Sequence, residues 1–419
     1  MELQVASPPL AKAKSARVIS VDVLRGIVMF TMVFVNDAYG AHRLPWWMKH
    51  FKEDGNGMTF VDVVFPAFLF IVGLSIPVAI ENRRAKGDSW LRIYGHAILR
   101  TLSLLAIGVL MVNEAPSGKY LHWPAGLWQV LMFGGVILAF HSVRLTRPAL
   151  RYTSLGLRIA GGLLLIFLAI MFRDNHGNIL QPSWWGILGL IGWAYITATT
   201  AYLLLRREGQ AALVGMAAVL MAMYYADHAG TFNAIQKWHF WIHGHKIAPL
   251  SVIGFGDMIG SQAAVAMAGV VIGSMLLPRT EQQSPGAKIR FAFVFAMLMV
   301  LAALLTYRSF GINKDNATPS WCFWSIAFTT LLWIGLYAII DVAGIRAWSI
   351  PIAWAGASAL MIYILSEGWD VLNEHFVNWP WYDHLGDSYP NAVYHKLITA
   401  AGLSLIAGVL GRIGFKLKL

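Results

Sequence analysis

The sequence predicts an all-α protein, a polytopic transmembrane helical bundle with both termini in the cytoplasm. Hydrophobic residues make up 58% of its 419 residues and charged residues only 13%, whereas soluble domains are nearer half apolar and a quarter charged. The apolar residues gather in runs of about 20, the length that crosses a bilayer as a helix. The 18 tryptophans and 14 tyrosines suit the membrane interfaces, where an apolar ring and a polar tip are both satisfied.

The length rule predicts about twelve spans, with ten or eleven as the alternative count. The predicted spans are 19–38, 58–80, 92–113, 123–143, 153–172, 184–205, 211–226, 251–278, 290–310, 321–342, 349–368 and 393–414. The span at 211–226 is the shortest. Residues 1–18 are expected to form a basic cytoplasmic segment, and 19–419 a single transmembrane domain.

Loop composition predicts the orientation. Lysine and arginine are concentrated in the loops on the side of the N-terminus, which the positive-inside rule places in the cytoplasm. The net charge of +11 therefore indicates membrane topology rather than nucleic-acid binding. The opposite side carries three longer loops, 39–57, 227–250 and 369–392, which are rich in Trp, His, Asp and Asn. Loops of that composition favour a binding function on the outer face.

The single cysteine and the glycine spacings limit the possible cross-links and predict helix packing. Cys322 is the only cysteine, which excludes an internal disulfide and a cysteine zinc finger. Two GxxxG spacings in the eighth span predict close helix packing. Their glycines are Gly256, Gly260, Gly269 and Gly273.

Ionisable groups within the spans are costly, so each needs a partner or a function. Asp22 and Arg25 lie three residues apart on one helical face, where they can pair. Arg100 lies about 12 Å into the third span at 1.5 Å per residue. Its permanent charge requires a carboxylate, such as Asp257 or Glu367, or an anionic ligand, and the sequence leaves both alternatives open.

A second polar group surrounds the outer loop between the first two spans. Asn36 and Asp37 end the first span, Asp62 begins the second, and His50 lies between them. A tight loop would bring these groups together, and an imidazole beside a carboxylate is the usual arrangement of a general base or nucleophile. The alternative is that Asp62 caps the second helix while His50 lies in water.

A histidine cluster in "WHFWIHGHK" is weaker evidence for a functional site than the His50 loop. His239 and His243 lie four residues apart, which would suit two metal ligands on one helical face, and His245 follows. No cysteine or glutamate completes a motif, so we expect an aromatic interfacial segment and no metal site.

Six segments of the chain resemble those of a known family. They are "SVDVLRGIVMFTMVFVND", "GMTFVDVVFPAFLFIVGLSI", "LRTLSLLAIGVLMVN", "GLWQVL", "INKDNATPSWCFWSIAFTTLLW" and "PIAWAGASALMIYILSE". In this order they resemble the heparan-α-glucosaminide N-acetyltransferase family and its bacterial relatives, over about two thirds of the chain.

The resemblance implies an acetyltransferase that takes acetyl from cytoplasmic acetyl-CoA and passes it to a glucosamine amine across the membrane. It implies that His50 is the active-site histidine, supported by Asn36 and Asp62. Arg25, Arg100 and Gln129 would contact coenzyme A. Further positions expected to contact the sugar are Asp37, Trp46, Trp47 and Glu367. A homodimer in a lipid membrane is consistent with the family.

The departures are informative. The intervals around His50 are longer than in the animal enzymes, which leaves His42 as a rival. The histidine that precedes the late glutamate in the family is here Ser366, and residues 153–226 resemble an insertion of extra helices. The animal lumenal domain is not matched, which favours a bacterial inner-membrane protein. The alternative function is a secondary transporter of a sugar or other small solute.

Overall fold

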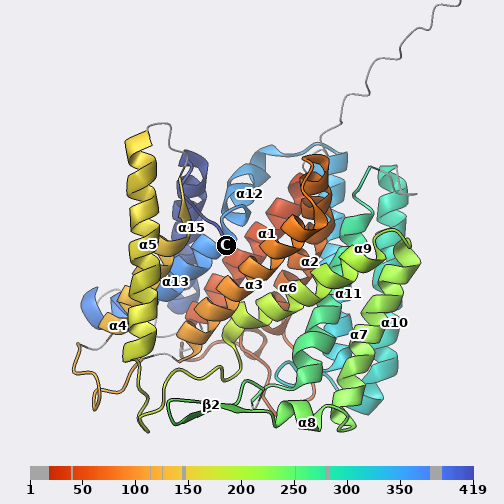
Figure 1. Cartoon of the computed structure of the whole chain (residues 1–419). Helices are drawn as coiled ribbons and strands as arrows, with labels where there is room; N and C mark the ends of the chain where they lie inside the picture. Colours follow the sequence, from red (N-terminus) through yellow and green to blue (C-terminus); the bar gives the residue numbers. More distant parts are fainter. Residues whose placement is uncertain are drawn as a thin grey trace, which may run out of the picture.

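The computed structural model describes residues 18–38, 41–113, 115–124, 126–143, 148–250, 252–278, 284–377 and 389–419. Most of the predicted cytoplasmic segment 1–18 lies outside them. The described residues form a bundle of long helices with two small antiparallel sheets (Figure 1).

The helices follow one another along the chain. In chain order they are α1 (Ile19–Ala38), η1 (Trp46–Met48), α2 (Val61–Ala85), α3 (Trp90–Val112), α4 (Leu127–Phe140), α5 (Pro148–Met171), α6 (Gly186–Leu205), α7 (Gln210–His228), α8 (Asn233–Gln236), η2 (Asp257–Ser261), α9 (Gln262–Ser274), α10 (Pro285–Phe310), α11 (Pro319–Leu336), η3 (Tyr337–Val342), η4 (Ala347–Ser349), α12 (Ile350–Gly356), α13 (Ala359–Leu372), η5 (Asn373–Val377) and α15 (Asn391–Ile413). The strands pair as β1 (His141–Ser142) with β4 (Lys416–Leu417), and β2 (Phe240–Ile242) with β3 (His245–Ile247).

The predicted fold class is confirmed. Ten helices of the described chain are long and apolar enough to cross a membrane, and a bent pair makes eleven. The predicted span 123–143 is represented by α4, which has only 14 residues and so covers about 21 Å of a hydrocarbon core near 30 Å. The predicted orientation of the termini stays a prediction.

Two predicted spans are not continuous α-helices. The span 349–368 is broken at Ala357 and Ser358, where α12 and α13 meet at 71°. The span 251–278 begins with the π-turn η2 before α9. Irregular backbone at membrane depth is tolerated where protein buries it or where it lines a cavity, and the first break lines one, as described below.

The prediction of close packing at the GxxxG glycines is confirmed. A Cβ at Gly269 or Gly273 would collide with backbone oxygen atoms of α2, so α9 and α2 pack backbone against backbone. Gly256 and Gly260 approach α7 in the same way. The central α9 is buried along its whole length.

The end of α15 turns the chain back into the bundle. Gly414 has a φ of 100°, a left-handed conformation that suits glycine and ends the helix. Leu417 then pairs with His141, and the Lys418 amide donates to Phe140 O (2.9 Å). Residues 415–419 therefore lie between helices, and Figure 1 places the C mark inside the bundle.

Candidate active site

His50 and Asp62 form an imidazole–carboxylate pair over the start of α2. Nδ1 of His50 lies 2.8 Å from Asp62 Oδ1. The Asp62 side chain is 1% exposed and the His50 side chain 30% exposed. Because a carboxylate only accepts hydrogen bonds, Nδ1 carries the proton in this pair, and Nε2 is the nitrogen at which the ring can act as a base.

Asp62 is fixed by further hydrogen bonds. Its Oδ2 accepts from the backbone amides of Phe51 (3.1 Å) and Thr59 (2.9 Å). The Thr59 hydroxyl donates to Lys49 O (2.7 Å) and lies 3.3 Å from the same carboxylate oxygen. Thr59 Oγ1 in turn accepts from the Val61 amide, so Thr59 and Asp62 form a capping box at the start of α2. Trp321 Nε1 donates to the backbone oxygen of Asp62 (3.1 Å) and ties α2 to α11. Asp62 therefore caps the helix and orients His50 at once, which joins the two alternatives left open by the sequence.

The other predicted outer-face groups form separate pairs. Asn36 Nδ2 donates weakly to Glu367 Oε1 of α13 (3.5 Å). Asp37 is bound by Lys396 of α15 (2.6 Å). Their partners lie on late helices that meet the C-terminal end of α1, and sequence spacing could not have identified them.

The predicted aromatic contacts and the rival histidine lie on the surface. Trp46 and Trp47 in η1 are 73% and 49% exposed, and Trp47 lies against the Phe60 ring at 6.0 Å. His42 is exposed, and its backbone oxygen accepts from the Tyr389 amide (3.1 Å). The Trp47–Phe60 contact links η1 to the residue that precedes α2, close to the His50–Asp62 pair.

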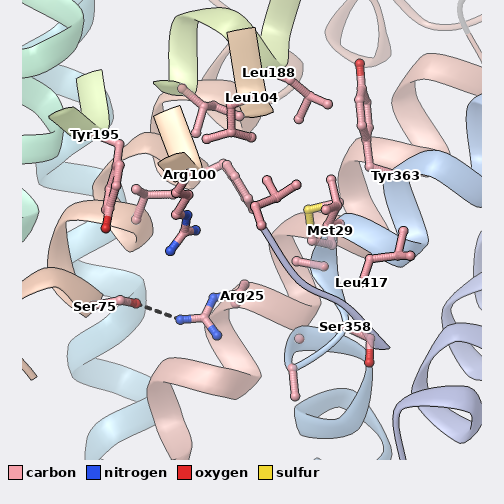
Figure 2. A pocket seen from close by; sticks show the side chains of 18 of the residues that line it. Arg25, Met29, Ser75, Arg100, Leu104, Leu188, Tyr195, Ser358, Tyr363 and Leu417 are labelled. Carbon is pink, nitrogen blue, oxygen red and sulfur yellow. Dashed lines mark hydrogen bonds between the residues drawn. The ribbon is translucent and has the colours of Figure 1, made fainter. Parts of the chain in front are cut away.

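A cavity of about 280 Å³ lies between α1, α2, α3, α6 and the α12–α13 break. Arg25 and Arg100 both line it, and Figure 2 shows their guanidinium groups facing the same space. Arg25 binds Asp22 (3.1 Å) and Ser75 (2.7 Å), so the predicted Asp22–Arg25 pair is present. The other side chains that line the cavity are mainly apolar and include Met29, Met32, Phe68, Leu104, Ile191 and Tyr363.

Arg100 pairs with neither of the two acids that the sequence offered as its partners. Its guanidinium stacks on the Tyr195 ring of α6, 4.7 Å from the ring centroid. No carboxylate partner of Arg100 is present in the part of the chain that the structure describes. Glu367 bonds Asn36, and Asp257 lies beside Asp227 at Gly254. The arginine is thus available to an anionic or polar ligand in the cavity.

The cavity and the His50–Asp62 pair are neighbours along the same helices. Met32, the last cavity residue on α1, lies about 6 Å along the axis from Asn36, and Phe68 on α2 about 9 Å from Asp62. Gln129, the third predicted coenzyme A residue, lies near the start of α4 and does not line the cavity. The structure thus brings Arg25 and Arg100 together but not Gln129.

Several residues of the site had no clear signal in the sequence. Thr59 is the exception, because a threonine three residues before an aspartate ahead of an apolar run is a capping signal. Tyr195 and the tail residues Leu417 and Leu419 reach the cavity from distant segments, and only tertiary structure brings them there. Ser75 lies in the second predicted span, where a lone serine attracts no attention.

The helical premise for the histidine cluster is wrong. Residues 240–247 form the β2–β3 hairpin, with positive φ at His243 (47°) and Gly244 (82°) in its two-residue turn. His239 precedes β2, so it does not share a helical face with His243. The exposed Trp241 agrees with an aromatic segment over the outer face.

Comparison with known proteins identifies the family of the chain. Residues 17–251 match the family described as Domain of unknown function (DUF5009), which covers more than half of the chain and includes α1, α2, His50 and Asp62. The chain is similar to heparan-alpha-glucosaminide N-acetyltransferase of Mus musculus (26% identity over 96% of this chain) and of Homo sapiens (25% over 94%). It spans 60% and 59% of the length of these curated relatives. The chain therefore belongs to the DUF5009 family and is a distant relative of the heparan-alpha-glucosaminide N-acetyltransferases.

Proposed function

We propose that this protein is a membrane-embedded acetyltransferase. It takes the acetyl group from acetyl-CoA on the cytoplasmic side and transfers it to the amine of a glucosamine or glucosaminide at the outer face. The observation that carries the proposal is the His50–Asp62 pair, a solvent-reachable imidazole held at 2.8 Å by a fully buried carboxylate. That arrangement fixes the tautomer and orientation of the ring and presents its distal nitrogen for proton transfer or attack.

Two chemical routes fit His50. In the first, Nε2 attacks the thioester carbonyl, the C–S bond breaks and coenzyme A leaves as the thiolate; the amine then takes the acetyl group from the imidazole, and the proton that it loses balances the thiolate. In the second, the amine attacks the thioester directly while Nε2 takes its proton; the C–S bond breaks, and the thiolate that leaves receives this proton from the imidazolium. In both routes Asp62 orients the ring, and the Asn36 amide is a candidate donor to the developing oxyanion.

The cavity supports the donor half of the proposal. Its apolar walls suit the thin acyl-pantetheine arm, and Arg25 and Arg100 supply cationic donors for its polar groups. Arg25 and Arg100, rather than Gln129, are therefore the proposed donor contacts. The outer aromatics Trp46 and Trp47 are proposed to stack on the sugar, together with the polar groups of Asp37 and Glu367.

The test is acetyl transfer from radiolabelled acetyl-CoA to glucosamine by purified protein in detergent. His50→Ala is compared with His42→Ala, a loop histidine that bonds through its backbone oxygen. We expect transfer by wild type and His42→Ala, and loss in a folded His50→Ala. Loss in His42→Ala alone would move the site to the rival histidine. A folded wild type that neither transfers acetyl nor gains thermal stability from acetyl-CoA would overturn the proposal in favour of a transporter.

A further inference from the structure

A second cavity, of about 420 Å³, lies between α12, the end of α15 and the returning tail. Its lining includes three basic side chains, Arg412, Lys416 and Lys418, and two serines, Ser142 and Ser358. No acidic side chain contributes to its wall among the residues that the structure describes. Like charges concentrated around one space repel each other unless an anion occupies it.

Local structure explains why these cations converge. Gly408 and Gly411 on α15 leave the wall without side chains, and the left-handed Gly414 turns the chain so that Lys416 and Lys418 return alongside Arg412. Strand β4 fixes the tail by pairing Lys416 with Ser142. Arg412 is held by stacking on the Trp354 ring, 4.2 Å from its centroid.

A buried hydroxyl without a partner also faces this region. Ser358 is 6% exposed, and its Oγ has no hydrogen-bond partner among the described residues. It lies at the α12–α13 break, and the missing side chain of Gly411 leaves the room that its hydroxyl occupies. A buried hydroxyl normally finds a partner, so the orphaned Oγ points to a group that the protein itself does not supply.

We propose that this second cavity is a phosphate-binding site, with Arg412, Lys416 and Lys418 neutralising the phosphate and Ser358 and Ser142 donating to its oxygens. Charge-assisted hydrogen bonds from several cations together with neutral hydroxyls are the usual means of holding a phosphate. Two sources offer that chemistry, the headgroup of an anionic lipid and the phosphates of a coenzyme A donor.

The position of the site bears on both sources. Ala357 and Ser358 line the first cavity as well as the second, so both cavities border the helix break. Figure 2 shows Ser358 among the residues of the first cavity. A donor whose acyl arm enters the first cavity would leave its phosphates near the second, and this source rests on the proposed function. The lipid source does not depend on it.

The test uses the full-length protein and two cavity variants. Arg412→Gln/Lys416→Gln/Lys418→Gln removes all three charges, and Lys416→Gln/Lys418→Gln keeps the Arg412–Trp354 stack. A matched control, Arg92→Gln/Lys288→Gln/Arg290→Gln, removes three charges outside the cavity. One arm measures binding of coenzyme A against pantetheine, which lacks phosphate. The other measures retention of phosphatidylglycerol over phosphatidylcholine by native mass spectrometry.

For a donor source, both cavity variants should bind coenzyme A at least tenfold more weakly, with pantetheine binding and the control unchanged. For a lipid source, they should lose the preference for phosphatidylglycerol while the control keeps it. Cavity variants that match the control in both arms, or a wild type that prefers neither phosphate ligand, would overturn the site. The last outcome separates the two proposals. If the wild type does not bind coenzyme A, but prefers phosphatidylglycerol and only the cavity variants lose that preference, the proposed function is wrong and the phosphate site stands.

Discussion

Replacing Asp62 with asparagine isolates the charge that holds His50. The amide oxygen can still accept from the Phe51 and Thr59 amides, which places its NH₂ group against His50 Nδ1. Two donors then face each other, so the ring must move its proton to Nε2 and loses the basic nitrogen at that position. We expect the rate of acetyl transfer to fall about 10²- to 10⁴-fold, the usual contribution of a positioned general base.

The cost in stability should be much smaller than the cost in rate. Hydrogen bonds to a charged acceptor contribute about 1.5–3 kcal/mol and neutral ones about 1 kcal/mol, so Asp62→Asn should lose about 1–2 kcal/mol. Asp62→Ala instead leaves the buried donors of Phe51 and Thr59 unsatisfied, at about 1–3 kcal/mol each.

The assay pairs radiolabelled transfer with thermal unfolding in the same detergent. A folded Asp62→Asn protein that transfers acetyl at the wild-type rate would refute the orienting role of Asp62. Equal losses of stability in the asparagine and alanine variants would refute the account of its hydrogen bonds.

The remaining predictions concern packing, donor affinity and pH. Gly269→Ala should lower the unfolding temperature because its Cβ strikes the backbone of α2, whereas Gly402→Ala, with open space around it, should not; equal effects would contradict the contact. Arg100→Gln should raise KM for acetyl-CoA more than it lowers kcat, since the proposal assigns it to binding, and the reverse split would exclude that role. Burial acts to raise the pKa of Asp174, but hydrogen bonds from the side chain and backbone of Asn178 outweigh it and hold the pKa below 3.8. The stability that Asp174 gives its loop should thus be present above that value and be lost as pH falls through the lowered pKa, which amide exchange at Asn178 would detect.

The sequence was sufficient where the signal is local or periodic. Apolar runs predicted the spans, small residues predicted close packing of the span that contains α9, and an Asp22–Arg25 spacing of one helical turn predicted their pair. His50 and Asp62 are 12 residues apart, and their contact was one of the two alternatives that the sequence left open. Thr59 is a local capping signal that the prediction did not include.

Features that depend on distant segments were not predictable in this way. The pairs Asn36–Glu367 and Asp37–Lys396 join residues more than 300 positions apart, and no spacing rule reaches that far. The 71° break before Ala359 was not predicted, because it lies within a continuous apolar run that carries no sign of it. The β2–β3 hairpin depends on the turn at His243 and Gly244. The four-residue spacing of His239 and His243 is also the spacing of one helical turn, so it suggested a helix instead.

The distribution of charge in the bundle favours a transferase over a transporter. One end of the membrane domain concentrates cations around cavities, with Arg25, Arg100 and the three basic residues of the second cavity. The other end carries acids on α13 and η5, with Glu367, Asp370 and Glu374 beyond the His50–Asp62 pair. An acyl-CoA donor is a polyanion and an amino-sugar acceptor is a cation, so each substrate would meet the opposite charge at its own end. Two separate substrates fit this division, because a transferase binds each substrate at its own end, whereas a transporter carries one solute past both.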